Sequence, residues 1–356
     1  MRNSLAYRGL LLLAIALSVV AFTAYYTDDR VVMGQTEDSV SKKTGGGERM
    51  LIVLAAPSIH DSYYRKHFNA LLAFHTSFAQ AAKEHDDLIV LADADTLPRL
   101  RGKIPDDQLL EADLADIWMR DFATVHPRRM VSFRYDRPKE PVVKKTFNNF
   151  VKRYQLNVSK NELKVDGGNV VDNGTDSAIM TEKVYARNPG VSPAQVRSRI
   201  KRALGLKRLA IIPMDDEYLG HSDGMVLWLS PTSVLMNRYQ EDPDFTYDVE
   251  SALRKSLPGV RIHKIPGAGY GEKYGRYASA CGIYVNATVT DRAIYVPVFD
   301  EDADEAALEL IRAHTNKSVV PLYAGDICEL GGSARCLSWQ LTGENAQKLI
   351  RAARKN

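Results

Sequence analysis

The stretch Met50-Leu51-Ile52-Val53-Leu54-Ala55 is an uninterrupted apolar run, which is typical of a strand covered on both faces of its sheet. A segment with apolar residues at helical spacing follows, and a second apolar run comes next. The expected elements are a helix within 62–84, strands at 88–92, 209–213 and 293–297, and helices at 192–204, 301–314 and 344–354. Strands that alternate with helices predict an α/β domain.

Length and composition narrow the class of protein. The 356 residues suffice for one large domain or two small ones, and a hydrophobic content of 45% is ordinary for a globular protein. A net charge of +3 argues against nucleic-acid binding and against a polybasic membrane surface. The chain has no Cys/His spacing that suits zinc, no Walker loop and no Gly-x-Gly-x-x-Gly after a strand, so we expect neither a metal site nor a nucleotide site.

The first 30 residues resemble a targeting segment. Arg2 and Arg8 precede an uncharged run over 9–26, which is borderline in length for a transmembrane helix. A cleaved signal peptide and an uncleaved single-pass anchor both stay open, and either would place the remaining chain outside the cytoplasm, secreted or tethered. The polar, Gly-rich residues 31–48 predict a flexible linker, so we expect the folded domain at 49–356.

The chain has three cysteines, Cys281, Cys328 and Cys336, too few for a disulfide scaffold. An odd count leaves at least one thiol free or paired between molecules. We weigh a Cys281–Cys328 bridge, which would leave Cys336 free, against three buried thiols. We favour the buried thiols, because nothing in the sequence brings the first two side chains together.

Short polar motifs stand at the predicted strand ends and turns, where site residues usually lie. In chain order they are Trp118-Met119-Arg120-Asp121, Asp166-Gly167-Gly168-Asn169, Gly220-His221-Ser222-Asp223-Gly224, Tyr284-Val285-Asn286 and Gly331-Gly332-Ser333-Ala334-Arg335-Cys336. A cysteine just beyond a Gly-Gly turn can act as a nucleophile where it opens on a cleft.

Taken together, the ordered motifs resemble the family of agmatine deiminases and bacterial peptidylarginine deiminases, within the wider guanidine-modifying superfamily. In this likeness 116–121 is similar to the family's acidic motif, and 166–169 to its Glu-Gly-Gly-Asn turn. Asn286 resembles the polar residue ahead of its penultimate strand. The resemblance implies a single-domain, five-bladed, pseudo-symmetric α/β propeller of the pentein type over 49–356. It also implies a site on the central axis and no cofactor.

The resemblance also implies roles for the catalytic side chains. A guanidinium is a planar cation with several N–H donors, which carboxylates grip in a fork geometry, and Asp121 and Asp223 are assigned that grip. Cys336 is assigned attack on the guanidinium carbon. His221 would protonate the leaving nitrogen, so that ammonia departs, and then act as base on the water that hydrolyses the adduct. The product is a ureido group, as in citrulline or N-carbamoylputrescine.

Other residues are assigned to the substrate site with less direct roles. Trp118 and Asn286 would border it, and Asp166 would support it through hydrogen bonds. Arg134 and Arg137 are placed much as the carboxylate-reading arginines of bacterial peptidylarginine deiminases. The alternative for these two is a solvated Arg–Asp–Arg cluster on the surface.

Departures from the family pattern leave the substrate open. Asp166 stands where the family usually has Glu. Ala334-Arg335 precedes Cys336 where agmatine deiminases usually carry Gly-Ile-His, and an Arg-Cys pair is closer to free-arginine deiminases. Agmatine, free arginine and peptidyl arginine all remain candidate substrates, and an extracytoplasmic location fits peptides better.

Functions outside hydrolysis also stay open. An amidinotransferase would use the same thiouronium intermediate, with an amine in place of water. A non-catalytic guanidinium-binding protein is disfavoured because the set of Asp121, His221, Asp223 and Cys336 is complete. A cysteine protease is disfavoured because a neutral peptide carbonyl does not call for acidic side chains in the pocket. The sequence predicts no oligomeric state, and a membrane partner only through the N-terminal segment.

Overall fold

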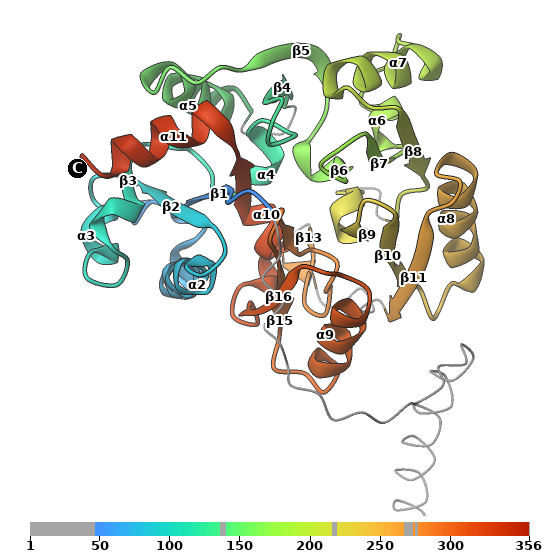
Figure 1. Cartoon of the computed structure of the whole chain (residues 1–356). Coiled ribbons are helices and arrows are strands. Elements are labelled where there is room, and N and C mark those ends of the chain that lie inside the picture. Colours follow the sequence, from blue (N-terminus) through green and yellow to red (C-terminus); the bar gives the residue numbers. More distant parts are fainter. Residues whose placement is uncertain (1–46, 136–139, 216–218, 267–272, 275–276, 356) are drawn as a thin grey trace, which may run out of the picture. The chain divides into compact units, whose positions relative to one another are not determined.

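The computed structural model describes residues 47–135, 140–215, 219–266, 273–274 and 277–355. These residues belong to one compact unit, Lys43–Asn356, and their secondary structure is mixed α/β, as predicted (Figure 1).

Two predicted segments lie wholly or largely outside the described residues. The signal peptide or anchor at 1–30 is one, and the linker at 31–48, except for its last two residues, is the other. Within the described part of the chain, no helix combines the length and the apolar character needed to cross a membrane.

The opening apolar run forms β1 (Leu51–Ala55), in a sheet of order β17-β1-β2-β3. Helix α2 (Phe68–Ala82) follows, and β2 (Asp87–Ala92) returns parallel to β1. Strand β3 (Leu109–Glu111) extends the parallel side, and β17 (Ser338–Leu341) pairs antiparallel with the other edge of β1. Every residue of β1 is buried, which explains why its sequence shows no polar alternation.

Four further units repeat this plan of strand, helix and parallel strand. They are β4 (Val131–Arg134) with α5 (Glu140–Arg153) and β5 (Ser159–Lys164); β7 (Ser177–Thr181) with α7 (Pro193–Leu204) and β8 (Arg208–Ile212); β10 (Ser233–Arg238) with α8 (Pro243–Ser256) and β11 (Arg261–Pro266); and β15 (Ala293–Val298) with α9 (Asp304–Ala313) and β16 (Ser318–Tyr323). The strands and helices predicted from the sequence are thereby confirmed, the last of them as α11 (Gly343–Ala353).

Shorter elements connect these units. They are the helices α3 (Leu97–Leu100), α4 (Met119–Phe122), α6 (Lys183–Ala186) and α10 (Ala334–Leu337), the strands β12 (Lys273–Tyr274) and β13 (Tyr277–Ala278), and 3₁₀ turns η1 (Arg65–His67), η2 (Asp106–Gln108), η3 (Gly167–Asn169), η4 (Ser222–Gly224) and η5 (Cys328–Leu330).

Short strands line the middle of this arrangement (Figure 1). They are β6 (Val171–Asp172), β9 (Val226–Ser230), β14 (Thr288–Val289) and β17, each antiparallel to the first strand of its unit. We call these the inner strands, because they bond to one another. Trp228 Nε1 of β9 donates to Val171 O of β6 at 3.0 Å. Thr288 Oγ1 of β14 lies 2.8 Å from Ser338 Oγ of β17.

The expectation of three unbridged thiols is wrong, because Cys281 and Cys328 form a disulfide with a Cα–Cα distance of 4.9 Å. The turn before Cys281 lies against η5, where Ala280 N donates to Cys328 O at 2.9 Å. That contact joins loops 47 residues apart in the sequence, so no local pattern could reveal it. Cys336 is free and buried.

The start of the described chain is fixed to the last unit. Gly47 O accepts a hydrogen bond from Arg292 Nε at 2.6 Å. Asp86 accepts from Met50 N at 3.0 Å and from Tyr295 OH at 2.8 Å, both within the core. Donors on several sides allow this carboxylate to be buried, and they hold the entering chain in place.

Candidate active site

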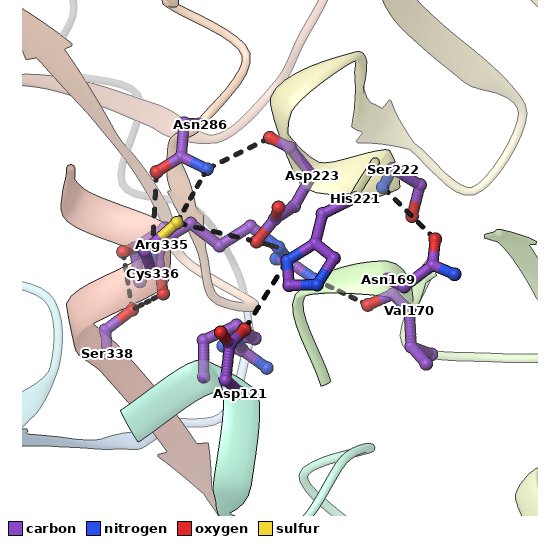
Figure 2. Close-up of polar contacts among 12 residues, drawn as sticks. Asp121, Asn169, Val170, His221, Ser222, Asp223, Asn286, Arg335, Cys336 and Ser338 are labelled. Atoms are coloured by element: carbon purple, nitrogen blue, oxygen red, sulfur yellow. Dashed lines mark hydrogen bonds and ion pairs between the residues drawn. The ribbon is translucent and has the colours of Figure 1, made fainter. Parts of the chain in front are cut away.

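The polar motifs from the sequence converge at one end of the inner strands (Figure 2). The turn with Asp166 leads into β6, the turn with Asp223 into β9, the turn with Asn286 into β14, and α10 with Cys336 into β17. Asp121 lies in α4, which precedes the first strand of its own unit. The repeated plan therefore explains how motifs far apart in sequence come together.

The glycine pair in the second motif allows this close approach. A Cβ at Gly168 would lie 2.5 Å from His221 Nδ1 and 2.7 Å from Asp121 Oδ1. At Gly167 it would lie 2.0 Å from Arg120 O. No side chain fits at either position without moving the site, so the turn needs both glycines.

Gly332 does the same beside the thiol. A Cβ there would lie 2.6 Å from Trp118 Cζ3 and 3.0 Å from Cys336 Sγ. The ring of Trp118 thus reaches the turn that carries the thiol, and it is only partly buried. The structure brings this predicted residue to the edge of the site.

His221 stands between two carboxylates. Its Nε2 lies 3.1 Å from Asp166 Oδ2, and its Nδ1 lies 3.5 Å from Asp121 Oδ1. The imidazole is buried, so these contacts fix the ring plane. A proton on Nε2 has an acceptor in Asp166, and Nδ1 lies beside the Asp121 carboxylate, which suits a group that gives and takes protons.

The Cys336 thiol is held by Asn286. The amide Nδ2 donates to Sγ at 3.2 Å and to Asp223 O at 3.1 Å. The amide Oδ1 accepts from Ser333 N at 3.2 Å, so the side chain bridges the two turns. Asp223 Oδ2 lies 3.9 Å from the sulfur.

Burial and neighbouring charges favour the neutral form of this thiol. Burial raises the pKa of the Cys336 thiol well above its usual range, and the charges of Asp223 and Asp121 raise it further. The hydrogen bond from Asn286 acts in the opposite direction. Burial also raises the pKa of Asp223, against the charges of His221 and Arg335.

The predicted side chains border a small pocket of about 60 Å³. Its lining includes His221, Asp223, Asn286 and Cys336, together with residues 278–280. Asp215, which our sequence reading did not assign, also lines it and accepts from Tyr239 OH at 2.8 Å. Only an acidic run at 215–217 could have drawn attention to it.

Arg335 is a second residue that the sequence reading left without a role. Its side chain is buried, and Nη2 donates to Val170 O at 3.0 Å. Its Nε lies 3.8 Å from Asp223 Oδ2. The position of Arg335 directly before Cys336 indicated that it lies near the site. The sequence did not show in which direction its guanidinium points.

The structure does not bring Arg134, one of the two predicted carboxylate-reading arginines, into this pocket. Arg134 ends β4 with an exposed side chain and is not part of the pocket lining. Arg137 lies outside the described residues. Within those residues, no group of three or more His, Cys, Asp and Glu side chains could hold a metal ion.

Comparison with known proteins places these features in context. Residues 47–341 match the family described as Porphyromonas-type peptidyl-arginine deiminase. The chain is 23% identical over 343 residues to an agmatine deiminase from Medicago truncatula, covering 80% of this chain and 91% of that protein.

Solved structures share the fold. The agmatine deiminase of C. jejuni aligns with a TM-score of 0.70 at 16% identity, covering 86% of this chain and 96% of that one. The agmatine deiminase of Enterococcus faecalis aligns with a TM-score of 0.69 at 16% identity, covering 82% and 93%.

Proposed function

The chain belongs to the Porphyromonas-type peptidyl-arginine deiminase family, and from this membership we propose that it hydrolyses a guanidino group to a ureido group with release of ammonia. One observation carries the proposal. The Cys336 thiol, the His221 imidazole and the Asp223 carboxylate line the same pocket, with the Asp121 carboxylate against the imidazole. A planar cation between carboxylates, facing a sulfur, is the arrangement that this reaction needs.

The first step uses the charge of the substrate. Asp121 and Asp223 bind the guanidinium, and its positive charge offsets the acids that raise the pKa of the Cys336 thiol. His221 takes the proton of the thiol, and Sγ forms a bond to the guanidinium carbon. His221 donates a proton to one nitrogen of this adduct, and the C–N bond breaks to release ammonia.

The second step reverses the role of the imidazole. His221, now lacking that proton, takes one from a water molecule that attacks the thiouronium carbon. The C–S bond breaks and the hydroxyl proton passes to solvent, so the ureido product leaves. His221 returns its proton to the sulfur, which restores the thiol. Asp166, at 3.1 Å from Nε2, keeps the ring oriented through both proton transfers.

Among the possible substrates we favour agmatine. Its far end is an ammonium, whereas arginine carries a carboxylate near that position. Among the described residues, Asp215 is the charged side chain that lines the pocket in addition to the reacting groups, and the predicted carboxylate reader Arg134 is exposed and outside the lining. An acidic wall attracts an amine and repels a carboxylate.

The finer architecture and the location are proposals as well. The repeated strand–helix–strand units and the inner strands that bond to each other support a five-bladed propeller of the pentein type. The Cys281–Cys328 disulfide supports an extracytoplasmic location, because such bonds persist in oxidising compartments.

The test is a substrate panel on the full chain: agmatine, free arginine, a peptide ending in arginine and one with internal arginine. Ammonia and ureido product are both measured, with Cys336→Ala alongside. We expect both products from agmatine and none from the variant. Turnover of arginine peptides would instead make Arg134 and Arg137 the next residues to mutate. If the wild type and Cys336→Ala formed the same amounts of ammonia and ureido product from every substrate, the proposal of Cys336-dependent hydrolysis would be contradicted.

A further inference from the structure

A second and larger cavity, of about 340 Å³, lies at the other end of the inner strands. The catalytic motifs come just before the N-terminal ends of β6, β9, β14 and β17. Residues at or near the C-terminal ends of the same strands line this cavity. Asp172, Ser230, Val289 and Gln340 mark those positions in turn. We call it the rear cavity.

Positive charge predominates in its lining. The lining contains two acidic residues, Asp172 and Asp291. It contains four basic residues, which are Arg120, Arg128, Lys317 and Arg335. Arg128 and Asp291 already form an ion pair at 2.5 Å. The remaining cations outnumber the remaining carboxylate.

Two of these cations are buried guanidiniums, each about 5% exposed. Arg120 Nη2 donates to Gln340 Oε1, and Arg335 Nη2 donates to Val170 O. Among the described residues, the Nε of each has no hydrogen-bond acceptor, although that of Arg335 lies 3.8 Å from Asp223 Oδ2 in an ion pair. Burial, together with the charge of Arg335, lowers the pKa of Arg120 to about 9. The two like charges therefore destabilise each other, and an anion between them would relieve this.

We propose that the rear cavity binds a small oxyanion, with inorganic phosphate as its simplest form, through Arg120, Arg335 and Lys317. A guanidinium presents parallel N–H donors that match two oxygens of a phosphate or carboxylate. Lys317 adds a compact charge, held near the loop by its bonds to Thr290 O and Asp291 O. Buried donors without acceptors are costly unless a ligand or water satisfies them.

The bound anion would also influence the catalytic pocket, and this part rests on the proposed function. Arg335 Nε lies 3.8 Å from Asp223 Oδ2, so its charge opposes a cationic substrate at that carboxylate. An anion in the rear cavity would offset that charge. The KM for the guanidine substrate should then fall, while kcat changes little.

The first test is calorimetric titration of the full chain with inorganic phosphate, at an ionic strength held constant with chloride. We expect saturable binding of one phosphate, weakened about tenfold or more in Lys317→Met. Lys103→Met, which removes an exposed lysine outside the lining, should bind like the wild type. Lys317→Gln, which also removes the charge but keeps a polar side chain, is a second cavity variant in case Lys317→Met does not fold.

The results separate the claims. The proposed site is overturned if phosphate gives no saturable heat, or if the wild type and a folded cavity variant bind it with equal affinity. The rear cavity would then hold water or an adventitious ion only. For the coupling, KM for agmatine is measured with and without saturating phosphate. We expect a decrease of about fivefold, at the low end of ordinary coupling between sites. Phosphate binding without a change in KM overturns the coupling. Failure of the proposed function would appear as no ureido product at any phosphate concentration, with the calorimetric result unaffected.

Discussion

The two ends of the inner strands carry opposite charge. At the catalytic end, a pocket of about 60 Å³ lies beside four carboxylates and a thiol, whereas cations outnumber carboxylates in the lining of the rear cavity of about 340 Å³. Residues adjacent in the sequence line opposite ends. Arg120 of the rear cavity precedes Asp121 of the catalytic site, and Arg335 precedes Cys336 in the same way. The positive charges of the buried Arg120 and Arg335 thus partly compensate the negative charges of the carboxylates that would bind a substrate.

The largest expected effect is at the catalytic end alone. Cys336→Ala removes the nucleophile, so kcat should fall about 10⁴-fold or more. The rear cavity should be untouched, so phosphate affinity should match the wild type. Ureido formation and calorimetry on one preparation check both expectations. Residual turnover within tenfold of the wild type would contradict the role of this thiol.

Crowding at the centre should give the next largest effect. Gly168→Ala places a methyl 2.5 Å from His221 Nδ1, so the imidazole must move and kcat should fall about 10²-fold. Gly224→Ala, which also lies in the pocket lining, is the comparison, since its Cβ would meet nothing within 4 Å. Steady-state rates of the two variants provide the measurement. Equal rates would show that the turn adjusts without disturbing the ring.

The disulfide should matter for the catalytic end more than for the rear. Replacing Cys281 and Cys328 by serine removes a cross-link over 47 residues and should lower the free energy of unfolding by roughly 2–4 kcal/mol. KM should rise, because the bonded loops include Ala280 and Gly331 of the pocket wall. Denaturant unfolding with and without a phosphine reductant tests this. The reductant should destabilise the wild type and leave the double variant unchanged.

The smallest expected effect is that of Asp223→Asn. Unlike the other variants, it should stabilise the folded protein. The pKa of Asp223 is raised by burial, so the folded protein is penalised when this carboxyl ionises, above the ordinary Asp pKa of about 4. Asp223→Asn should therefore raise Tm by a few degrees at pH 7, although activity is lost. The gain should vanish as the pH falls below about 4.

Thermal unfolding across this pH range provides the measurement for Asp223→Asn. Asp113→Asn, at an exposed position, serves as the control and should leave Tm unchanged. A variant less stable than the wild type at pH 7 would show that the charges of His221 and Arg335 outweigh burial.

Prediction from sequence worked for some uniformly buried strands and missed others, such as β7, Ser177–Thr181, which is buried at every residue but has polar residues at both ends. Strand β1 is buried at every residue, and its apolar run shows this directly. Strand β5, Ser159–Lys164, lies at the edge of its two-stranded sheet and buries only Leu163, so its sequence resembles a polar loop. Strand β11 was missed for the same reason. Edge strands carry too little apolar pattern to be recognised alone.

The candidate site divides in a similar way. Cys336, His221, Asp223 and Asn286 could be predicted because each stands in a short motif of recognisable order, and the structure brings them together. Asp215 and the Cys281–Cys328 bond could not, because they depend on contacts between distant loops. Arg335 was visible, but its direction depends on Val170 O, a backbone atom that no residue pattern reveals.

The bond between Gly47 O and Arg292 Nε has a practical consequence for handling the protein. Arg292 follows Asp291 of the rear cavity, and Met50 also lines that cavity. The polypeptide thus enters the domain at the end away from the thiol. A solid support or fusion partner joined ahead of residue 47 would leave the catalytic mouth facing outward. An immobilised catalyst made in this way should keep access to bulky substrates.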